Sequence, residues 1–362
     1  MIQILLIIFC TILLLNCCVF TVHAEDFTSV YEETGRQLDD LLADFDVGFT
    51  STELESFSIG DFWDLLCGTV SAHIHAPLRL LGAIFLVIAA ISLLNTLVGD
   101  GLSGEFRGLN SLVATLTSMA VITPIVTEMY NNTLMTLRIA GNYILVFVPV
   151  FCSFSVICGN VTSAGFFHFA ILTASELLVR LADSFLLPLL CLCTYLGISG
   201  SIFGGKNLSY ISDLLQKAIN RVISVTAMLF AGFVTMKCNV AAKADGLGAK
   251  AVKSAISGFV PIVGGAVSDA YGTVKGSFEL LHGTVGMVGV IALTIIIVPK
   301  VVELLIFRAV LNIGIAAAGL FSAEPVAGLL KCFDNGLSVA LCVLVCHSLT
   351  FVVCTGMIIQ TL

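Results

Sequence analysis

Three charged residues share an otherwise apolar segment and are the first candidates for chemistry. Glu176, Arg180 and Asp183 stand at positions i, i+4 and i+7, so a helix would place their side chains on one face. Ionisable groups in apolar helices are costly and usually face a bundle interior or an aqueous path. The spacing predicts a proton or ion relay, a structural ion pair between helices, or an interfacial helix with a solvated face.

A glycine- and proline-interrupted apolar run, Ile256–Val267, is the second candidate site. Pro261, Gly264 and Gly265 interrupt it, and its twelve residues are too few to span a bilayer as a helix. Glycine and proline also free backbone groups that protein or water must satisfy. We expect either a broken or re-entrant element that lines a cavity, with Asp269 near its end, or a flexible interfacial hinge.

Other residues with chemical potential give weaker signals. For Arg308 and His347, single polar groups in later apolar segments, we expect a packing role. The chain has 13 cysteines but no CxxC pair, so we interpret its buried thiols as small apolar side chains rather than metal ligands. The P-loop, HExxH and GxSxG motifs are absent from the sequence. We therefore expect no catalytic residue, no metal and no cofactor.

The composition identifies the environment that must position these residues. Of the 362 residues, 58% are hydrophobic and 11% are charged, whereas an ordinary soluble domain has about 45–50% apolar and about 25% charged residues. The remaining charge is too small to cover a water-soluble globule of this size. The chain is therefore expected to be an integral membrane protein, and a soluble enzyme with a large core is excluded.

Charge is distributed unevenly along the chain. Residues 25–76 carry twelve acids and one base, Arg36, while the rest of the chain has a small excess of bases. This distribution argues against nucleic-acid binding, which needs a positive footprint. The apolar run at residues 4–22, followed by His23 and Ala24, is typical of a signal peptide, although no basic residue precedes it. Cleavage after Ala24 or retention as an anchor would both place residues 25–76 outside the cytoplasm.

Apolar segments long enough to cross a bilayer predict an all-α, polytopic membrane protein. We expect about seven to nine transmembrane helices after the signal-like segment, with a break at Pro299–Lys300. The segments are Pro77–Val98, Ser111–Thr127, Ile139–Cys158, Ala164–Asp183, Ser184–Phe203, Arg221–Met236, Gly283–Pro299, Val301–Phe321 and Leu337–Gln360.

These features divide the chain into five regions. Asn207–Asn220 is an amphipathic helix that either connects segments on the bundle or docks a cytoplasmic partner. The regions are a signal-like segment (1–24), an acidic extracytoplasmic head (25–76), a first group of membrane helices (77–203), an amphipathic helix with a short span and the interrupted run (204–282), and C-terminal membrane helices (283–362).

The orientation of the chain follows from its charges only in part. If the head lies outside and successive membrane segments cross in alternate directions, residues 204–220, with Lys206 and Lys217, lie on the cytoplasmic side. This placement agrees with the positive-inside rule. Alternation then places residues 237–282 outside, although this region contains five lysines. One predicted segment must therefore be wrong, and the side on which 237–282 lies stays open.

The segment Lys250–Ser277 resembles a hallmark of the stage III sporulation protein AE family of endospore-forming bacteria. Its most specific part reads FVPIVGGAVSDA, and the order of a signal-like start, an acidic head and a polytopic body is also similar along nearly the whole chain. The resemblance places Phe259, Pro261, Gly264, Gly265 and Asp269 at motif positions. It implies structural or pore-associated roles for them.

The resemblance also implies a function. Members of this family are non-enzymatic subunits of a transenvelope, secretion-like channel in the mother-cell membrane around the forespore. Implied partners are the lipid bilayer, a secretion-type ATPase, ring-forming subunits from the same operon and a forespore channel protein, with no nucleic acid. Two alternatives stay open: an ion-coupled secondary transporter, in which Glu176, Arg180 and Asp183 line the substrate path, and a signalling scaffold with the acidic head as sensor.

Overall fold

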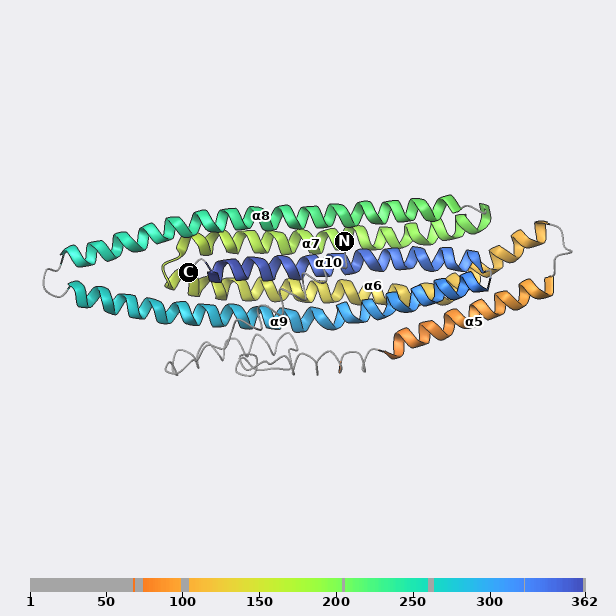
Figure 1. Ribbon diagram of the computed structural model, residues 1–362, viewed down its shortest axis with the longest axis horizontal. Coiled ribbons are helices and arrows are strands. Elements are labelled where there is room, and N and C mark those ends of the chain that lie inside the picture. The colour runs from red at the N-terminus through yellow and green to blue at the C-terminus, as the bar shows by residue number, and fades with distance from the viewer. Residues whose placement is uncertain are drawn as a thin grey trace.

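Long α-helices make up the part of the chain that the computed structural model describes, which is residue 68 and residues 74–98, 104–203, 206–259, 264–321 and 323–360. They form an elongated bundle of nearly aligned helices (Figure 1). The all-α fold is confirmed for these residues; the signal-like segment and most of the acidic head lie outside them. The helices are α5 (His75–Val98), α6 (Gly104–Ile157), α7 (Val161–Phe203), α8 (Lys206–Phe259), α9 (Gly264–Leu320) and α10 (Glu324–Gln360).

Several helices are much longer than a bilayer is thick. α6 has 54 residues and α9 has 57, and at about 1.5 Å per residue each exceeds ~80 Å, against about 30 Å for a hydrocarbon core. Ser111–Thr127 and Ile139–Cys158 belong to the single helix α6, and α7 joins another two predicted segments. Five of the described helices are long and apolar enough to cross a membrane, so the expected count of seven to nine is not confirmed.

The break expected at Pro299–Lys300 is wrong. α9 continues through Pro299, and α6 and α7 likewise contain Pro124, Pro149 and Pro188 in their interiors. A proline removes one backbone hydrogen bond, and in a membrane helix neighbouring groups and local adjustments compensate for it. A single proline was therefore a poor sign of a helix end.

The chain does reverse at Cys158–Asn160, between α6 and α7. Gly159 has a φ of 87°, in the left-handed region that glycine adopts without steric cost at the end of a helix. Its amide donates to the carbonyl of Val156, and the amide of Asn160 donates to that of Ser155. These bonds satisfy carbonyl groups that the end of α6 would otherwise leave unpaired.

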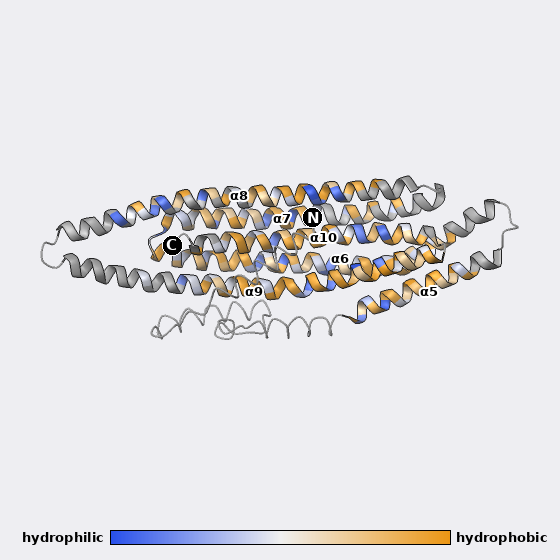
Figure 2. Cartoon of the chain, viewed as in Figure 1, coloured by the Kyte–Doolittle hydropathy of each residue, from blue (hydrophilic) through white to orange (hydrophobic). Residues whose placement is uncertain are grey.

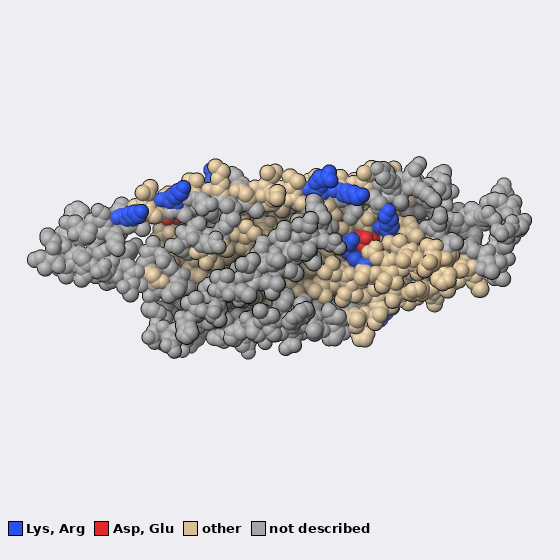
Figure 3. Space-filling model, viewed as in Figure 1, with Lys and Arg blue, Asp and Glu red and all other residues tan. Residues whose placement is uncertain are grey.

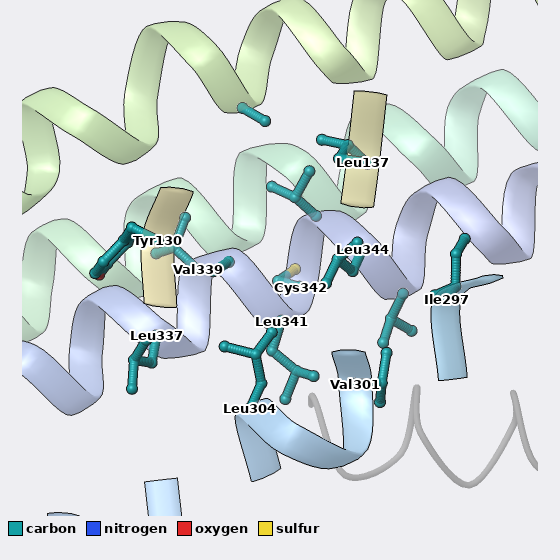
Figure 4. Packing of buried hydrophobic residues seen from close by; sticks show 14 of the residues in the cluster. Tyr130, Leu137, Ile297, Val301, Leu304, Leu337, Val339, Leu341, Cys342 and Leu344 are labelled. Atoms are coloured by element: carbon teal, nitrogen blue, oxygen red, sulfur yellow. The ribbon is translucent and has the colours of Figure 1, made fainter. Parts of the chain in front are cut away.

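α10 occupies the centre of the bundle and contacts α6, α7, α8 and α9. In its apolar span, 89% of the residues are buried by the rest of the chain, so protein rather than lipid surrounds this helix. Figure 4 shows side chains of α10 packed between those of α6 and α9. The labelled residues are Leu337, Val339, Leu341, Cys342 and Leu344 of α10, Tyr130 and Leu137 of α6, and Ile297, Val301 and Leu304 of α9.

An aromatic row on α6 packs against a glycine-bearing face of α9. The rings of Tyr143 and Phe147 stack at 5.6 Å between centroids, and those of Phe147 and Phe151 at 5.7 Å. A Cβ atom on Gly289 would overlap the ring of Phe147, and the hydroxyl of Tyr143 donates to the Gly289 carbonyl at 3.3 Å. Glycine at position 289 thus allows the two helices to approach closely.

Candidate functional site

The charged face predicted on α7 exists but points outward. Arg180 donates to Glu176 at 2.7 Å, and their side chains are 76% and 62% exposed. Asp183 pairs instead with Arg138 of α6 at 3.0 Å, a partner that sequence reasoning missed because it lies 45 positions earlier. The contact of Asp183 with Arg138 is an ion pair between two helices. Side chains this exposed do not form a path through the interior of the bundle.

A surface groove of about 590 Å³ runs between α6 and α7 beside these ion pairs. We call it the charged groove. It combines charged, amide and hydroxyl groups with apolar walls. Its lining includes Arg138, Asn142, Leu145, Ser175, Glu176, Leu177 and Arg180.

A third ion pair is buried within α9. The Lys300 ammonium lies 2.9 Å from the Glu303 carboxylate, and the two side chains are 6% and 12% exposed. The Lys300 ammonium also donates to the sulfur of Met129 on α6 at 3.4 Å, and the Glu128 carboxylate of α6 interacts with it electrostatically. The i, i+3 spacing was visible in the sequence, but the predicted break at Pro299–Lys300 concealed it.

Arg308 of α9 has the packing role that was expected. Its Nε donates to Asp334 of α10 at 2.8 Å, and its second terminal nitrogen donates to the same carboxylate at 3.2 Å. This two-point geometry is among the strongest that arginine makes with a carboxylate. It ties the central helix to α9.

Three of these ion pairs interrupt the apolar stretches of α6, α7, α9 and α10. Arg138, Asp183 and Lys300 stand at or beside boundaries between predicted membrane segments, within helices that are continuous. Figure 2 shows hydrophilic residues that interrupt otherwise hydrophobic stretches of the central helices, and further hydrophilic residues on α8 toward the left of the view. We call this set the charged belt, and it comprises Arg138, Asp183, Lys300, Glu303, Arg308 and Asp334. These polar interruptions in the sequence are therefore paired charges within continuous helices rather than loops.

The interrupted run lies at one end of the molecule. α8 ends at Phe259 and α9 begins at Gly264; Gly265 and Asp269 fall in the first turns of α9, and Pro261 lies outside the described residues. Figure 1 shows these ends of α8 and α9 projecting beyond α6, α7 and α10. The side chains of this run are not among those described, so its role in lining a cavity stays a prediction.

Asp245 of α8 caps the first turn of α7, a role that sequence reasoning missed. Its carboxylate accepts hydrogen bonds from the backbone amides of Thr162 and Ser163 at 3.1 and 2.9 Å, and from the Ser163 hydroxyl at 2.7 Å. Burial of Asp245 acts to raise the pKa of the carboxyl group, but the bonds from Ser163 and Thr162 together outweigh it, so the pKa lies below its ordinary value of 3.8. The charged form of Asp245 thus stabilises the packing of α8 against the N-terminal turn of α7.

Removing the Asp245 cap is expected to weaken the contact between α8 and the first turn of α7, by an amount that depends on pH. Asp245→Ala should lower the free energy of unfolding by about 0.5–2 kcal/mol at neutral pH, as loss of a helix N-cap does. Because folding lowers the pKa of Asp245, its contribution is complete above the unfolded pKa and is lost as pH falls through the lower folded pKa. The measurement is the free energy of unfolding of the wild-type protein and of Asp245→Ala, both in detergent, at pH 7 and near pH 3. The difference between the two proteins should be smaller near pH 3. Equal losses at the two pH values would contradict it.

A buried serine–histidine pair links α6 and α9. The Ser155 hydroxyl lies 2.6 Å from His282 Nε2, and the His282 ring stacks on Phe151 at 4.2 Å between centroids. Serine activated by histidine is a common catalytic nucleophile, with the base oriented by a third group. Here both residues are fully buried, and His282 Nδ1 has no hydrogen-bond partner among the described residues. We interpret the pair as a link between helices.

The described residues contain no group of His, Cys, Asp or Glu side chains that could hold a metal ion. Six of the seven cysteines described are buried, which fits their interpretation as small apolar side chains. His347 is buried in α10, and neither of its ring nitrogens has a hydrogen-bond partner among the described residues.

The long apolar helices and buried centre place this chain in the class of helical membrane proteins. It belongs to the stage III sporulation protein AE family, whose model matches residues 46–361. The chain is similar to the stage III sporulation protein AE of Bacillus subtilis (strain 168), with 25% identity over 193 residues. That alignment covers 53% of this chain and 48% of the relative, so it spans about half of each. No solved structure matches the chain.

Family membership confirms the resemblance found at Lys250–Ser277 and supports a role in sporulation. The matched region contains all six described helices. It therefore includes the charged belt, the cap at Asp245 and the interrupted run.

Proposed function

We propose that this chain is a non-enzymatic membrane subunit of a transenvelope channel between mother cell and forespore, required for late forespore development. Its partners in this proposal are the bilayer, a secretion-type ATPase, ring-forming subunits and a forespore channel protein. It resides in the mother-cell membrane that surrounds the forespore, with the acidic head outside the cytoplasm. The observation that carries the proposal is the family match over residues 46–361, combined with five apolar helices of membrane-spanning length.

The site geometry favours a structural subunit over an ion-coupled carrier. A carrier binds its substrate near the bilayer midplane, at the interface between repeated helical units. The Glu176 and Arg180 side chains instead lie on the outside of the bundle, where each neutralises the other. The charges inside the bundle are paired as well, since Lys300 contacts Glu303 and Arg308 contacts Asp334.

Inactivating the gene in its spore-forming host tests the proposed function. We expect vegetative growth to continue and spore development to stop after engulfment, so that the count of heat-resistant spores falls to background. A wild-type copy supplied at a second locus should restore the count. Normal sporulation of the mutant would refute the proposal.

The interrupted run offers a second test, directed at its proposed pore-associated role. Single cysteines at Phe259 and Asp269, in a chain whose own accessible cysteines are replaced, can be labelled with a membrane-impermeant thiol reagent. A run that lines an aqueous path should react from the aqueous phase and be protected when the complete complex is assembled. Equal reactivity in the isolated and assembled protein would contradict this role and favour the hinge.

A further inference from the structure

The outer face of α6, beside α7, exposes more apolar length than one bilayer can cover. The apolar span of α6, Val113–Ile157, has 45 residues and is about 68 Å long, more than twice the ~30 Å hydrocarbon core. Large apolar side chains are exposed along it, from Val113 and Leu116 at one end to Val156 at the other. Since contiguous apolar surface outside lipid marks a protein contact, part of this face needs a protein to cover it.

The charged groove lies within this face, between its apolar parts. Arg138, Glu176 and Arg180 line the groove, and Asp183 pairs with Arg138 beside it. Together these side chains carry two positive and two negative charges, so their net charge is zero. Exposed apolar side chains, Leu145 and Leu177, belong to the same groove. A surface that covers the groove must therefore offer apolar contact together with charges of both signs.

We infer that a second copy of this chain packs against the charged groove, with the two copies related by a two-fold axis. In such a contact the same patch meets itself, so Arg180 of each copy can face Glu176 of the other. The balanced signs make the patch self-complementary, which favours this pairing and disfavours others. An anionic lipid or an acidic segment would meet Arg180 but would be repelled by Glu176 and Asp183.

The outer face of α8 has the opposite character and does not suit self-association. Five cationic side chains are exposed along it, and no described acidic side chain of α8 is exposed beside them; Figure 3 shows Lys and Arg atoms along the edge that α8 forms. Two copies meeting there would bring like charges together. The cations are Lys217, Arg221, Lys237, Lys243 and Lys250.

Co-purification of two differently tagged full-length copies from one cell tests this contact. Wild-type copies should co-purify in mild detergent. Arg180→Glu alone places acid against acid across the two-fold axis, and Glu176→Arg alone places base against base. Each should reduce recovery of the second copy by about tenfold or more, which corresponds to a cost of at least ~1.4 kcal/mol. A cell expressing one copy with Arg180→Glu and the other with Glu176→Arg should regain recovery, because opposite charges then meet.

Recovery of the second copy from the cell that expresses both variants distinguishes a contact between copies from a defect within each chain. In that cell neither copy has regained its own ion pair between positions 176 and 180. Lys217→Glu on α8 is the matched control and should leave recovery unchanged. The inference is overturned if wild-type copies do not co-purify, if the single reversals have no effect, or if the mixed pair recovers no more than either variant alone.

Discussion

Glu303→Ala is expected to destabilise the folded bundle by about 3–5 kcal/mol, as removal of one partner of a buried ion pair does. The substitution leaves the Lys300 ammonium, whose side chain is 6% exposed, with the weakly accepting sulfur of Met129 as its hydrogen-bond partner. Among the described residues, the Glu128 carboxylate is a further opposite charge that interacts with Lys300 without forming an ion pair. Unfolding of the purified protein in detergent by added sodium dodecyl sulfate would measure the loss. Lys217→Ala, at an exposed cation on α8, should change stability by less than about 0.5 kcal/mol.

Replacing both partners separates the cost of an unpaired charge from the value of the pair. The double variant Lys300→Met, Glu303→Leu removes both charges while keeping similar volumes. Because apolar replacement of a buried pair is often neutral or stabilising by about 1–4 kcal/mol, it should be much more stable than Glu303→Ala. A double variant as unstable as the single one would show that the pair itself stabilises the fold.

Gly289→Ala is expected to cost about 1–3 kcal/mol, the usual penalty for overpacking a filled core. The added Cβ would overlap the ring of Phe147, whereas a Cβ on Gly283 of the same helix has no atom within 4 Å. Gly283→Ala should therefore be neutral or stabilising by up to about 1 kcal/mol, since alanine favours a helix over glycine. The same detergent unfolding assay compares the two.

A second substitution that removes the overlap between the new Cβ atom and the Phe147 ring tests whether this overlap causes the loss of stability. Phe147→Leu, combined with Gly289→Ala, removes the ring that the new Cβ would meet. We expect the pair to be more stable than the sum of the two single effects predicts, which is the signature of residues in contact. Strict additivity would contradict direct contact at this position.

Sequence patterns located the apolar segments but could not tell where one helix ended and the next began. Residues 128–138 contain several polar side chains but no glycine or proline, so the helix continues through them, and polarity alone was mistaken for a boundary. Pro299 was misjudged for a related reason, because neighbouring helices stabilise a proline that would break an isolated one. Continuity depended on packing that the local sequence does not encode.

The charged site was predictable only where its members share a helix. The spacing of Glu176, Arg180 and Asp183 predicts a shared helix face, and in the structure Glu176 and Arg180 pair with each other on α7. The partner of Asp183 lies on α6, and Asp245 reaches α7 from 82 positions away, so neither contact leaves a local pattern. The resemblance at Lys250–Ser277 identified the family, but family membership does not specify which charges meet.

The central helix is also the last of the six in chain order, which has a consequence for biosynthesis. As the ribosome delivers the chain from its N-terminal side, α6, α7, α8 and α9 are synthesised before the helix that packs against all four of them. Until α10 arrives, Arg308 lacks Asp334 and Asn220 lacks Ser338, their partners in the finished protein. The nascent protein therefore passes through a hollow, incompletely neutralised state, and quality-control proteases would encounter the chain in this state.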